Sequence, residues 1–270
     1  MTEPRPFTIA VYQYAARDET PDDRLARLAE AAARAAAEGA RLLVTPEMFL
    51  SGYAVPRALV HARAEPRDGP FAQAVAGIAR ARDLAIVYGY PESADGIVYN
   101  AAHCIGPDGR TLANHRKIEL AGAGERDVYA PGDRLTSFML DGHRVAVLVC
   151  YDVEFPETVR RAALGGATLV AVPTALVDRH PFVAHRMVPT RAFENGVYVA
   201  YANYAGREGE ASYLGASCVS GPTGGECARA GSEEALITAT VDPARIREAR
   251  ATIPYLEDFR RLPADPEAGS

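Results

Sequence analysis

Segments rich in β-branched and aromatic residues alternate with Ala- and Leu-rich segments along most of this 270-residue chain. The strand-like segments lie at residues 7–14, 41–45, 84–88, 98–105, 111–116, 145–150, 168–172, 197–203, 217–220 and 236–241. The helix-like segments lie at residues 24–38, 71–82, 156–164 and 181–194. This alternation is typical of an α/β fold in which helices cover the faces of sheets. The short connection between 98–105 and 111–116 is that of a hairpin and therefore predicts mixed sheets.

No sequence repeat and no low-complexity linker divides the chain. We therefore predict one domain over residues 1–250 and a tail over residues 251–270. The tail is expected to be irregular, with Pro254-Tyr255-Leu256 docking on the body of the domain or on a partner subunit. The last residues, ADPEAGS, are expected to be disordered.

The composition is that of a globular protein and excludes several functions. Hydrophobic residues make up 48% and charged residues 24% of the chain, which excludes a disordered chain or a coiled coil. The net charge is -6 and basic residues occur only in isolated pairs such as Arg160-Arg161, so no nucleic-acid partner is expected. The apolar runs are too short for a membrane span, and the N-terminus lacks a signal-peptide pattern. We predict a cytoplasmic protein with no membrane partner.

The four cysteines and six histidines form no recognisable metal or disulfide pattern. There is no CxxC pair, no HExxH motif and no Walker A sequence. We therefore expect no metal and no organic cofactor.

Three reactive side chains stand where predicted strands end. Glu47 follows RLLVTP, Lys117 follows RTLANHR and Cys150 ends VAVLVC. Ligands of open α/β sheets bind at the carboxyl ends of strands, where these groups would form a base, a cation and a nucleophile. Each residue alone has an ordinary structural explanation: a buried inert thiol, a surface lysine and a loop carboxylate. The three together favour a catalytic site.

These segments resemble the nitrilase superfamily of carbon–nitrogen hydrolases. The resemblance is carried by TPEMFLSGY around Glu47, HRKIEL around Lys117 and CYDVEFPE from Cys150. It extends to GERDVYAPGD, which contains Glu125, to VPTA, and to RAFENGVYVAYANY, and so covers nearly the whole chain. The resemblance implies a four-layer α-β-β-α sandwich, with the site at one end of two sheets, and a homodimer or larger homo-oligomer.

The resemblance also implies a role for each site residue. Cys150 is the nucleophile, Glu47 the general base and Lys117 the cation that stabilises the oxyanion, together with the backbone N–H of Tyr151. Glu125 orients Lys117 or the substrate. The residues expected to bind substrate are Tyr53, Tyr151, Glu154 and Thr174.

The function predicted in this way is hydrolysis of a small primary amide to a carboxylic acid and ammonia. The flanks CYDVEFPE, VYGYPE and YANY look most like bacterial amidases of small amides, including ω-amino amides such as 5-aminopentanamide. A cationic tail would suit the acids Asp152, Glu154 and Glu157 near the nucleophile, with Tyr53 and Tyr204 beside it. A nitrilase and an N-carbamoyl-amine hydrolase would use the same three residues.

Other classes of function receive less support from the sequence. A Cys–His amidotransferase places its cysteine between glycines, whereas Cys150 lies between Val149 and Tyr151. A serine hydrolase needs GxSxG, and the segment GASCV at residues 215–219 fails at its last position. A non-catalytic binding protein on the same fold would be expected to have lost one of the three reactive residues.

Overall fold

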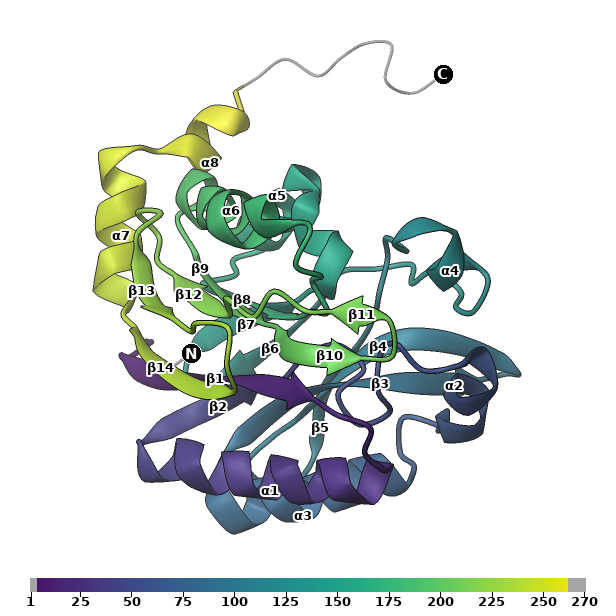
Figure 1. The fold of residues 1–270 in the computed structure, drawn as a ribbon. Coiled ribbons are helices and arrows are strands. Elements are labelled where there is room, and N and C mark those ends of the chain that lie inside the picture. The colour runs from purple at the N-terminus through teal and green to yellow at the C-terminus, as the bar shows by residue number, and fades with distance from the viewer. Residues whose placement is uncertain (1–3, 262–270) are drawn as a thin grey trace.

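A computed structural model describes residues 4–261 and shows an α/β protein with two mixed sheets. The two sheets pack face to face, with helices α1 and α3 outside one sheet and α5 and α6 outside the other (Figure 1). The four-layer α-β-β-α arrangement expected from the sequence is therefore confirmed.

The first sheet has eight strands in the order β11-β10-β1-β2-β3-β4-β5, with β14 also paired to β1. Strands β1, β2 and β3 are mutually parallel, whereas β3, β4 and β5 form an antiparallel meander, which confirms the predicted hairpin. The strands are β1 (Phe7–Ala16), β2 (Ala40–Val44), β3 (Ala85–Ala94), β4 (Ile97–Ile105), β5 (Thr111–Arg116), β10 (Tyr204–Glu208), β11 (Ala211–Ser212) and β14 (Ala235–Val241).

The second sheet has six strands in the order β13-β12-β9-β8-β7-β6. Strands β7, β8 and β9 are parallel, and antiparallel strands close both edges. The strands are β6 (Thr136–Leu140), β7 (His143–Val147), β8 (Leu169–Pro173), β9 (Tyr198–Ala202), β12 (Cys218–Ser220) and β13 (Glu226–Arg229).

The helices begin and end largely where the sequence signals place them. Thr20 and Asp23 form a reciprocal capping box at the start of α1, and Pro is the first residue of α1, α3 and α5. The helices are α1 (Pro21–Ala37), α2 (Arg57–Arg63), α3 (Pro70–Arg82), α4 (Gly122–Arg126), α5 (Pro156–Leu164), α6 (Val188–Asn195), α7 (Pro243–Thr252) and α8 (Tyr255–Phe259). A 3-10 helix η1 (Cys150–Glu154) and a π-helix η2 (Val183–Met187) complete the described elements.

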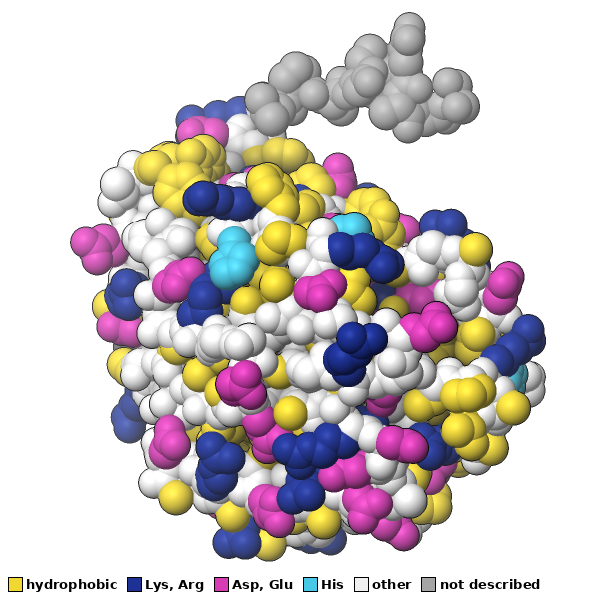
Figure 2. Space-filling model, in the orientation of Figure 1, with side chains coloured by type: hydrophobic (Ala, Val, Ile, Leu, Met, Phe, Trp, Pro, Cys, Tyr) yellow, Lys and Arg dark blue, Asp and Glu magenta, His cyan; other side chains and the backbone are white. Residues whose placement is uncertain are grey.

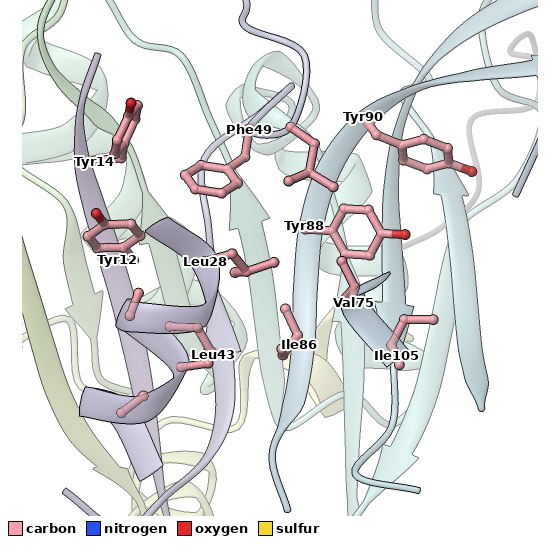
Figure 3. Close-up of a cluster of buried hydrophobic side chains, with 14 of the residues drawn as sticks. Tyr12, Tyr14, Leu28, Leu43, Phe49, Val75, Ile86, Tyr88, Tyr90 and Ile105 are labelled. Atoms are coloured by element: carbon pink, nitrogen blue, oxygen red, sulfur yellow. The ribbon is translucent and has the colours of Figure 1, made fainter. Parts of the chain in front are cut away.

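The hydrophobic core lies in three layers, one between the sheets and one beneath each pair of outer helices. Figure 3 shows the layer between the first sheet and helices α1 and α3, where Leu28 and Val75 meet Leu43 and Ile86 from the strands. Phe49 packs into the same layer and makes an edge contact with Tyr14, with ring centroids 5.3 Å apart. Phe49 follows Glu47 by two residues, so this packing fixes the chain directly after the candidate base.

Several elements differ from the sequence-based expectation. Strand β7 ends at Val147, and Cys150 begins η1 instead of ending a strand. The predicted helix over residues 181–194 contains a π-helical turn before α6.

The expectation that the tail is irregular is wrong over the described part, because α7 continues to Thr252 and α8 follows. Tyr255 packs on Phe193 of α6, and Leu256 packs against the core beneath α5 and α6, so this part docks on the body of the domain. The segment ADPEAGS lies outside the described residues. The single domain over residues 1–250 stays a prediction.

Within residues 4–261, no helix combines the length and the apolar character needed to cross a membrane.

Candidate active site

Three strand ends bring the candidate catalytic residues to one end of the sandwich. Glu47 follows β2, Lys117 directly follows β5 and Cys150 follows β7. Strand β5 runs in the same direction as β2, because two antiparallel pairings separate it from β3, which is parallel to β2. The carboxyl ends of β2 and β5 therefore lie at the same edge of the first sheet, and Cys150 reaches this edge from the second sheet.

The turn that carries Glu47 is tightly held. Met48 has φ +52°, in the left-handed region that non-glycine residues rarely adopt and that costs about 1–3 kcal/mol. Gly89 of β3 passes so close that a Cβ there would lie 2.2 Å from the Met48 nitrogen. The Tyr204 hydroxyl donates to the Glu47 carbonyl at 2.8 Å, and the Glu47 N–H donates to the Thr174 carbonyl at 3.3 Å. These contacts give the Glu47 side chain a defined direction.

Lys117 lies between two carboxylates in the interior of the protein. Its Nζ donates to Glu47 Oε1 and to Glu125 Oε1, each at 2.7 Å, and both Lys117 and Glu47 are fully buried. Asn100 Nδ2 also donates to Glu47 Oε1, at 2.7 Å. The other oxygen, Glu47 Oε2, is buried and accepts no hydrogen bond from any residue of the described chain. Glu47 therefore keeps one carboxylate oxygen free for a proton.

Glu125 links the lysine to the wall of the site. Its Oε1 accepts from the Tyr53 hydroxyl at 2.8 Å as well as from Lys117, and its Oε2 accepts from the Ala121 N–H at 2.7 Å. The backbone of Tyr53 is held in turn by Glu208, whose Oε2 accepts from the Tyr53 N–H at 2.9 Å. Glu125 therefore fixes both the ammonium of Lys117 and the phenol of Tyr53.

Cys150 occupies a strained turn at the beginning of η1. Its φ is +48°, in the left-handed region that non-glycine residues rarely adopt. Helix α5 begins six residues later at Pro156, so the chain passes from strand to turn to helix within a short distance. This geometry places a side chain at the tip of the turn, as in α/β-hydrolases, where the nucleophile lies on a sharp turn between a strand and a helix.

Burial and charge together shift the pKa values of the three groups. Burial raises the pKa of Glu47 from 4.5 to about 7, against the opposing effect of Lys117. Burial works against the charge on Lys117, but Glu47, Cys150 and Glu125 outweigh it and raise the pKa of Lys117. Burial, reinforced by Glu47, raises the pKa of the Cys150 thiol well above its usual range. At neutral pH the site therefore holds a neutral thiol, a charged lysine and a carboxyl group near its midpoint.

Cys150 lies on the wall of a cavity of about 690 Å³. Tyr53, Tyr151 and Glu154, three of the four residues predicted to bind substrate, also line it. Thr174 does not: it is fully buried, and its hydroxyl donates to the Tyr201 hydroxyl at 3.0 Å. Its neighbour Ala175 lines the cavity instead. Thr174 is placed to support the wall and not to touch substrate.

Sequence reasoning did not find several residues that shape the site. Asn100 lies in the middle of β4 and carries no motif, so only the fold reveals its contact with Glu47. Asp152 was expected near a cationic tail of the substrate, yet it is fully buried and accepts hydrogen bonds from the chain around Lys117 and from Val149. Among residues 4–261, no group of three or more His, Cys, Asp or Glu side chains is placed to hold a metal ion.

Comparison with known proteins agrees with this arrangement. The carbon-nitrogen hydrolase family model matches residues 8–251. A Pseudomonas protegens protein named "Hydrolase in pqqF 5'region" is 46% identical, over 93% of this chain and 88% of its own length. An (R)-stereoselective amidase of a Pseudomonas species is 34% identical, over 94% of this chain and 92% of its own length.

The solved structures that match include an amidase from Nesterenkonia sp. AN1. It superposes with a TM-score of 0.81 at 36% identity, covering 94% of this chain and 97% of that chain. Other structures of the same amidase hold butyramide or acrylamide, and one shows covalent addition of the acetamide moiety of fluoroacetamide at its active site cysteine.

The family model covers nearly the whole described chain, one relative is named an amidase, and the solved structures that match are amidases with the same fold. The chain belongs to the carbon-nitrogen hydrolase family of the nitrilase superfamily and is an enzyme of the amidase type.

Proposed function

We propose that the protein hydrolyses a small primary amide to a carboxylic acid and ammonia, with Cys150 as nucleophile, Glu47 as general base and Lys117 as oxyanion stabiliser. One observation carries the proposal. Lys117 is held at 2.7 Å from both Glu47 and Glu125 in a buried cluster. The charges of this cluster act on the pKa of the Cys150 thiol, and Cys150 lines a cavity of about 690 Å³.

The first step joins sulfur to the amide carbon. The thiol is neutral because burial raises the pKa of Cys150, so its proton must leave as the S–C bond forms. Glu47 takes this proton on its free Oε2. The carbonyl oxygen gains the negative charge, and the Lys117 ammonium stabilises it together with the N–H of Tyr151 in the first turn of η1.

The second step breaks the C–N bond and leaves a thioester. Protonated Glu47 returns its proton to the leaving nitrogen, which departs as ammonia. A water molecule then attacks the thioester carbon while Glu47 accepts one of its protons. The C–S bond breaks, Glu47 returns that proton to the Cys150 sulfur, and the carboxylic acid is released. The pKa of Glu47, raised to about 7, suits a group that must accept and donate the same proton near neutral pH. Lys117 remains charged throughout, since its pKa is raised.

We propose that the acyl group is short and that its tail is a cationic amine held by Glu154. Glu154 lines the cavity, is half-buried, and its carboxylate has no hydrogen bond or ion pair to another described residue. A carboxylate in this position favours an ammonium group or a hydrogen-bond donor on the ligand. Binding of butyramide and acrylamide by the Nesterenkonia amidase supports the short acyl chain.

The other residues expected near a cationic tail are placed elsewhere. Asp152 is buried away from the cavity, and Glu157 is exposed in the first turn of α5. The Tyr204 hydroxyl donates to the Glu47 backbone and does not line the cavity. Of the residues expected near a cationic tail, Glu154 and Tyr53 therefore remain on the cavity wall.

The amidase proposal is tested by ammonia release from matched amides, nitriles and N-carbamoyl amines. We expect turnover of the amide, with loss of activity in Cys150→Ala and a fold unchanged by circular dichroism. More than trace ammonia release by Cys150→Ala would refute the thioester route. Faster turnover of the nitrile or the carbamoyl amine would show that the amide is not the preferred substrate. The roles of Glu47, Lys117 and Cys150 would be unchanged.

The tail proposal is tested by comparing 5-aminopentanamide with pentanamide and hexanamide at about pH 7.5. We expect the amino amide to be the preferred substrate. The preference should fall in Glu154→Gln, because the Gln side chain carries no charge to pair with the substrate ammonium. A preference for the uncharged amides would refute the cationic tail. An unchanged preference in Glu154→Gln would show that another group holds it.

We further propose that the protein forms a homodimer or larger homo-oligomer. Large aromatic side chains are exposed around α5, α6 and α8, among them Phe193, Tyr255 and Phe259. Figure 2 shows hydrophobic side chains gathered at this end of the molecule. Sedimentation equilibrium should give a mass of at least two chains, and a monomer at micromolar concentration would contradict the proposal.

A further inference from the structure

Asp152 is a fully buried carboxylate that accepts four hydrogen bonds and forms no part of the cavity wall. Its Oδ1 accepts from the backbone N–H groups of Ile118 at 3.1 Å and Glu119 at 2.8 Å. Its Oδ2 accepts from the Val149 N–H at 3.0 Å and lies 3.1 Å from His115 Nε2. A carboxylate can accept about four hydrogen bonds, so Asp152 is saturated.

These four donors come from two segments of different sheets. His115, Ile118 and Glu119 lie on either side of Lys117, at the end of β5 in the first sheet. Val149 immediately precedes Cys150, beyond the end of β7 in the second sheet. Asp152 thus ties the chain around the lysine to the chain around the cysteine.

The contact with His115 is itself directional. Asp152 can only accept, so the shared proton belongs to His115 Nε2, while His115 Nδ1 is buried without a partner in the described chain. In this tautomer the only N–H of the His115 ring donates to Asp152. Neither side chain lines the cavity, so neither has a direct task in binding substrate.

We propose that Asp152 is a positioning residue for amide hydrolysis, which holds the Lys117 ammonium and the Cys150 sulfur in register across the two sheets. The proposal rests on the role of Lys117 given under "Proposed function". Lys117 acts most strongly when the oxyanion forms, so a shift of its ammonium should slow the chemical step more than it weakens substrate binding. A displacement of about 1 Å at a reacting centre can lower the rate roughly a hundredfold.

Loosening this contact should also move the pH profile. The groups that face Glu47 are Lys117, which lowers its pKa, and Glu125, which raises it; Asn100 donates to the same oxygen as Lys117. The remaining titratable neighbours are the thiol of Cys150 and four phenols, all with raised pKa values and therefore neutral. These phenols belong to Tyr53, Tyr129, Tyr204 and Tyr213. If Lys117 moves away, the pKa of Glu47 rises, and the rising limb of the rate profile shifts to higher pH.

The decisive variant is Asp152→Asn, which keeps the shape of the side chain but presents an NH2 group to one pair of its donors. We expect kcat to fall roughly a hundredfold with KM changed less than about threefold. We also expect the rising limb of kcat/KM to move to higher pH. The control is Glu157→Gln, which removes an exposed carboxylate five residues after Asp152. It should leave kcat, KM and the rising limb unchanged.

A matched pair at His115 covers the outcome in which Asp152→Asn does not fold. Gln can place an amide N–H near the position of His115 Nε2, whereas Leu cannot donate a hydrogen bond. We expect His115→Gln to resemble the unmodified enzyme and His115→Leu to show the lower kcat and the shifted limb. Equal kcat and equal pH profiles in the two variants would overturn the proposal.

Two results with Asp152→Asn would also overturn it. One is a folded variant with kcat within about threefold of the unmodified enzyme. The other is a lower kcat without a shifted limb, because a smaller folded fraction scales the rate equally at every pH. Lys117→Ala separates this proposal from the mechanism: if that variant keeps its activity, the role of Lys117 is wrong, whereas if it is inactive and Asp152→Asn is normal, only the positioning role fails.

Discussion

The Glu47→Gln substitution tests the general base with little change in shape. The remaining amide oxygen can accept from Lys117 and Asn100, as Glu47 Oε1 does now at 2.7 Å from each. The new NH2 group occupies the position of Oε2, which has no partner among the described residues. Lys117 keeps its ion pair with Glu125 at 2.7 Å, so the buried ammonium is not left uncompensated. We therefore expect a folded protein that lacks a proton acceptor beside Cys150.

The size of the effect follows from what is removed. General base catalysis contributes roughly 10²–10⁴ in rate, so kcat/KM should fall by about that factor. The new NH2 group replaces an oxygen that is already buried without a partner, so we expect little change in the melting temperature.

The pH profile of kcat/KM distinguishes this explanation from a general loss of structure. In the unmodified enzyme, burial raises the pKa of Glu47 to about 7, so activity should rise through about pH 7 as Glu47 loses its proton. The pKa values of Lys117 and Cys150 are raised, so no falling limb from these groups should occur below about pH 9. In Glu47→Gln the rising limb should disappear.

Glu125→Gln is the matched control, because it removes a carboxylate from the same lysine. Glu125 raises the pKa of Glu47, so its neutralisation should move the rising limb to lower pH while keeping it. If the limb near pH 7 persists in Glu47→Gln, another group is the base and the reasoning is refuted.

Three further substitutions have defined outcomes. Gly89→Ala should lower both activity and melting temperature, because its Cβ would lie 2.2 Å from the Met48 nitrogen and displace Glu47; equal activity and stability would show that the turn can move freely. Lys117→Arg should lower kcat/KM at least roughly a hundredfold, since a planar guanidinium cannot replace the ammonium between two carboxylates; near-normal efficiency in steady-state assays would contradict this. Cys227→Ala should keep full ammonia release, because that thiol lies outside the cavity, and inactivation would disprove it.

The architecture and the three reactive residues could be predicted because local signals carry them. Alternating strand and helix patterns predicted an α/β fold with mixed sheets, and motifs at three strand ends predicted Glu47, Lys117 and Cys150. The four-layer sandwich was implied by the resemblance to the nitrilase superfamily. Helices α7 and α8 were missed because the segment after residue 243 is rich in charged residues and shows little helical periodicity. Their position depends on packing of Tyr255 and Leu256 against distant residues.

Contacts between residues far apart in the sequence could not be predicted from it. Asn100 reaches Glu47 across 53 residues, and Asp152 reaches Ile118 across 34, so only the three-dimensional pairing of strands reveals them. The protonation of the site also required the fold. Burial raises the pKa of Glu47 and Lys117 lowers it, and the balance depends on how completely both side chains are buried.

The central claim is that the acyl group passes through Cys150. Rapid quenching in acid during turnover of a short amide, followed by digestion and mass spectrometry, tests it directly when released ammonia is measured in the same samples. We predict a mass gain of one acyl group on the peptide that contains Cys150, formed together with the first equivalent of ammonia and absent from Cys150→Ala. An initial burst of ammonia with Cys150 unmodified, or an acyl group on another residue, would contradict the account.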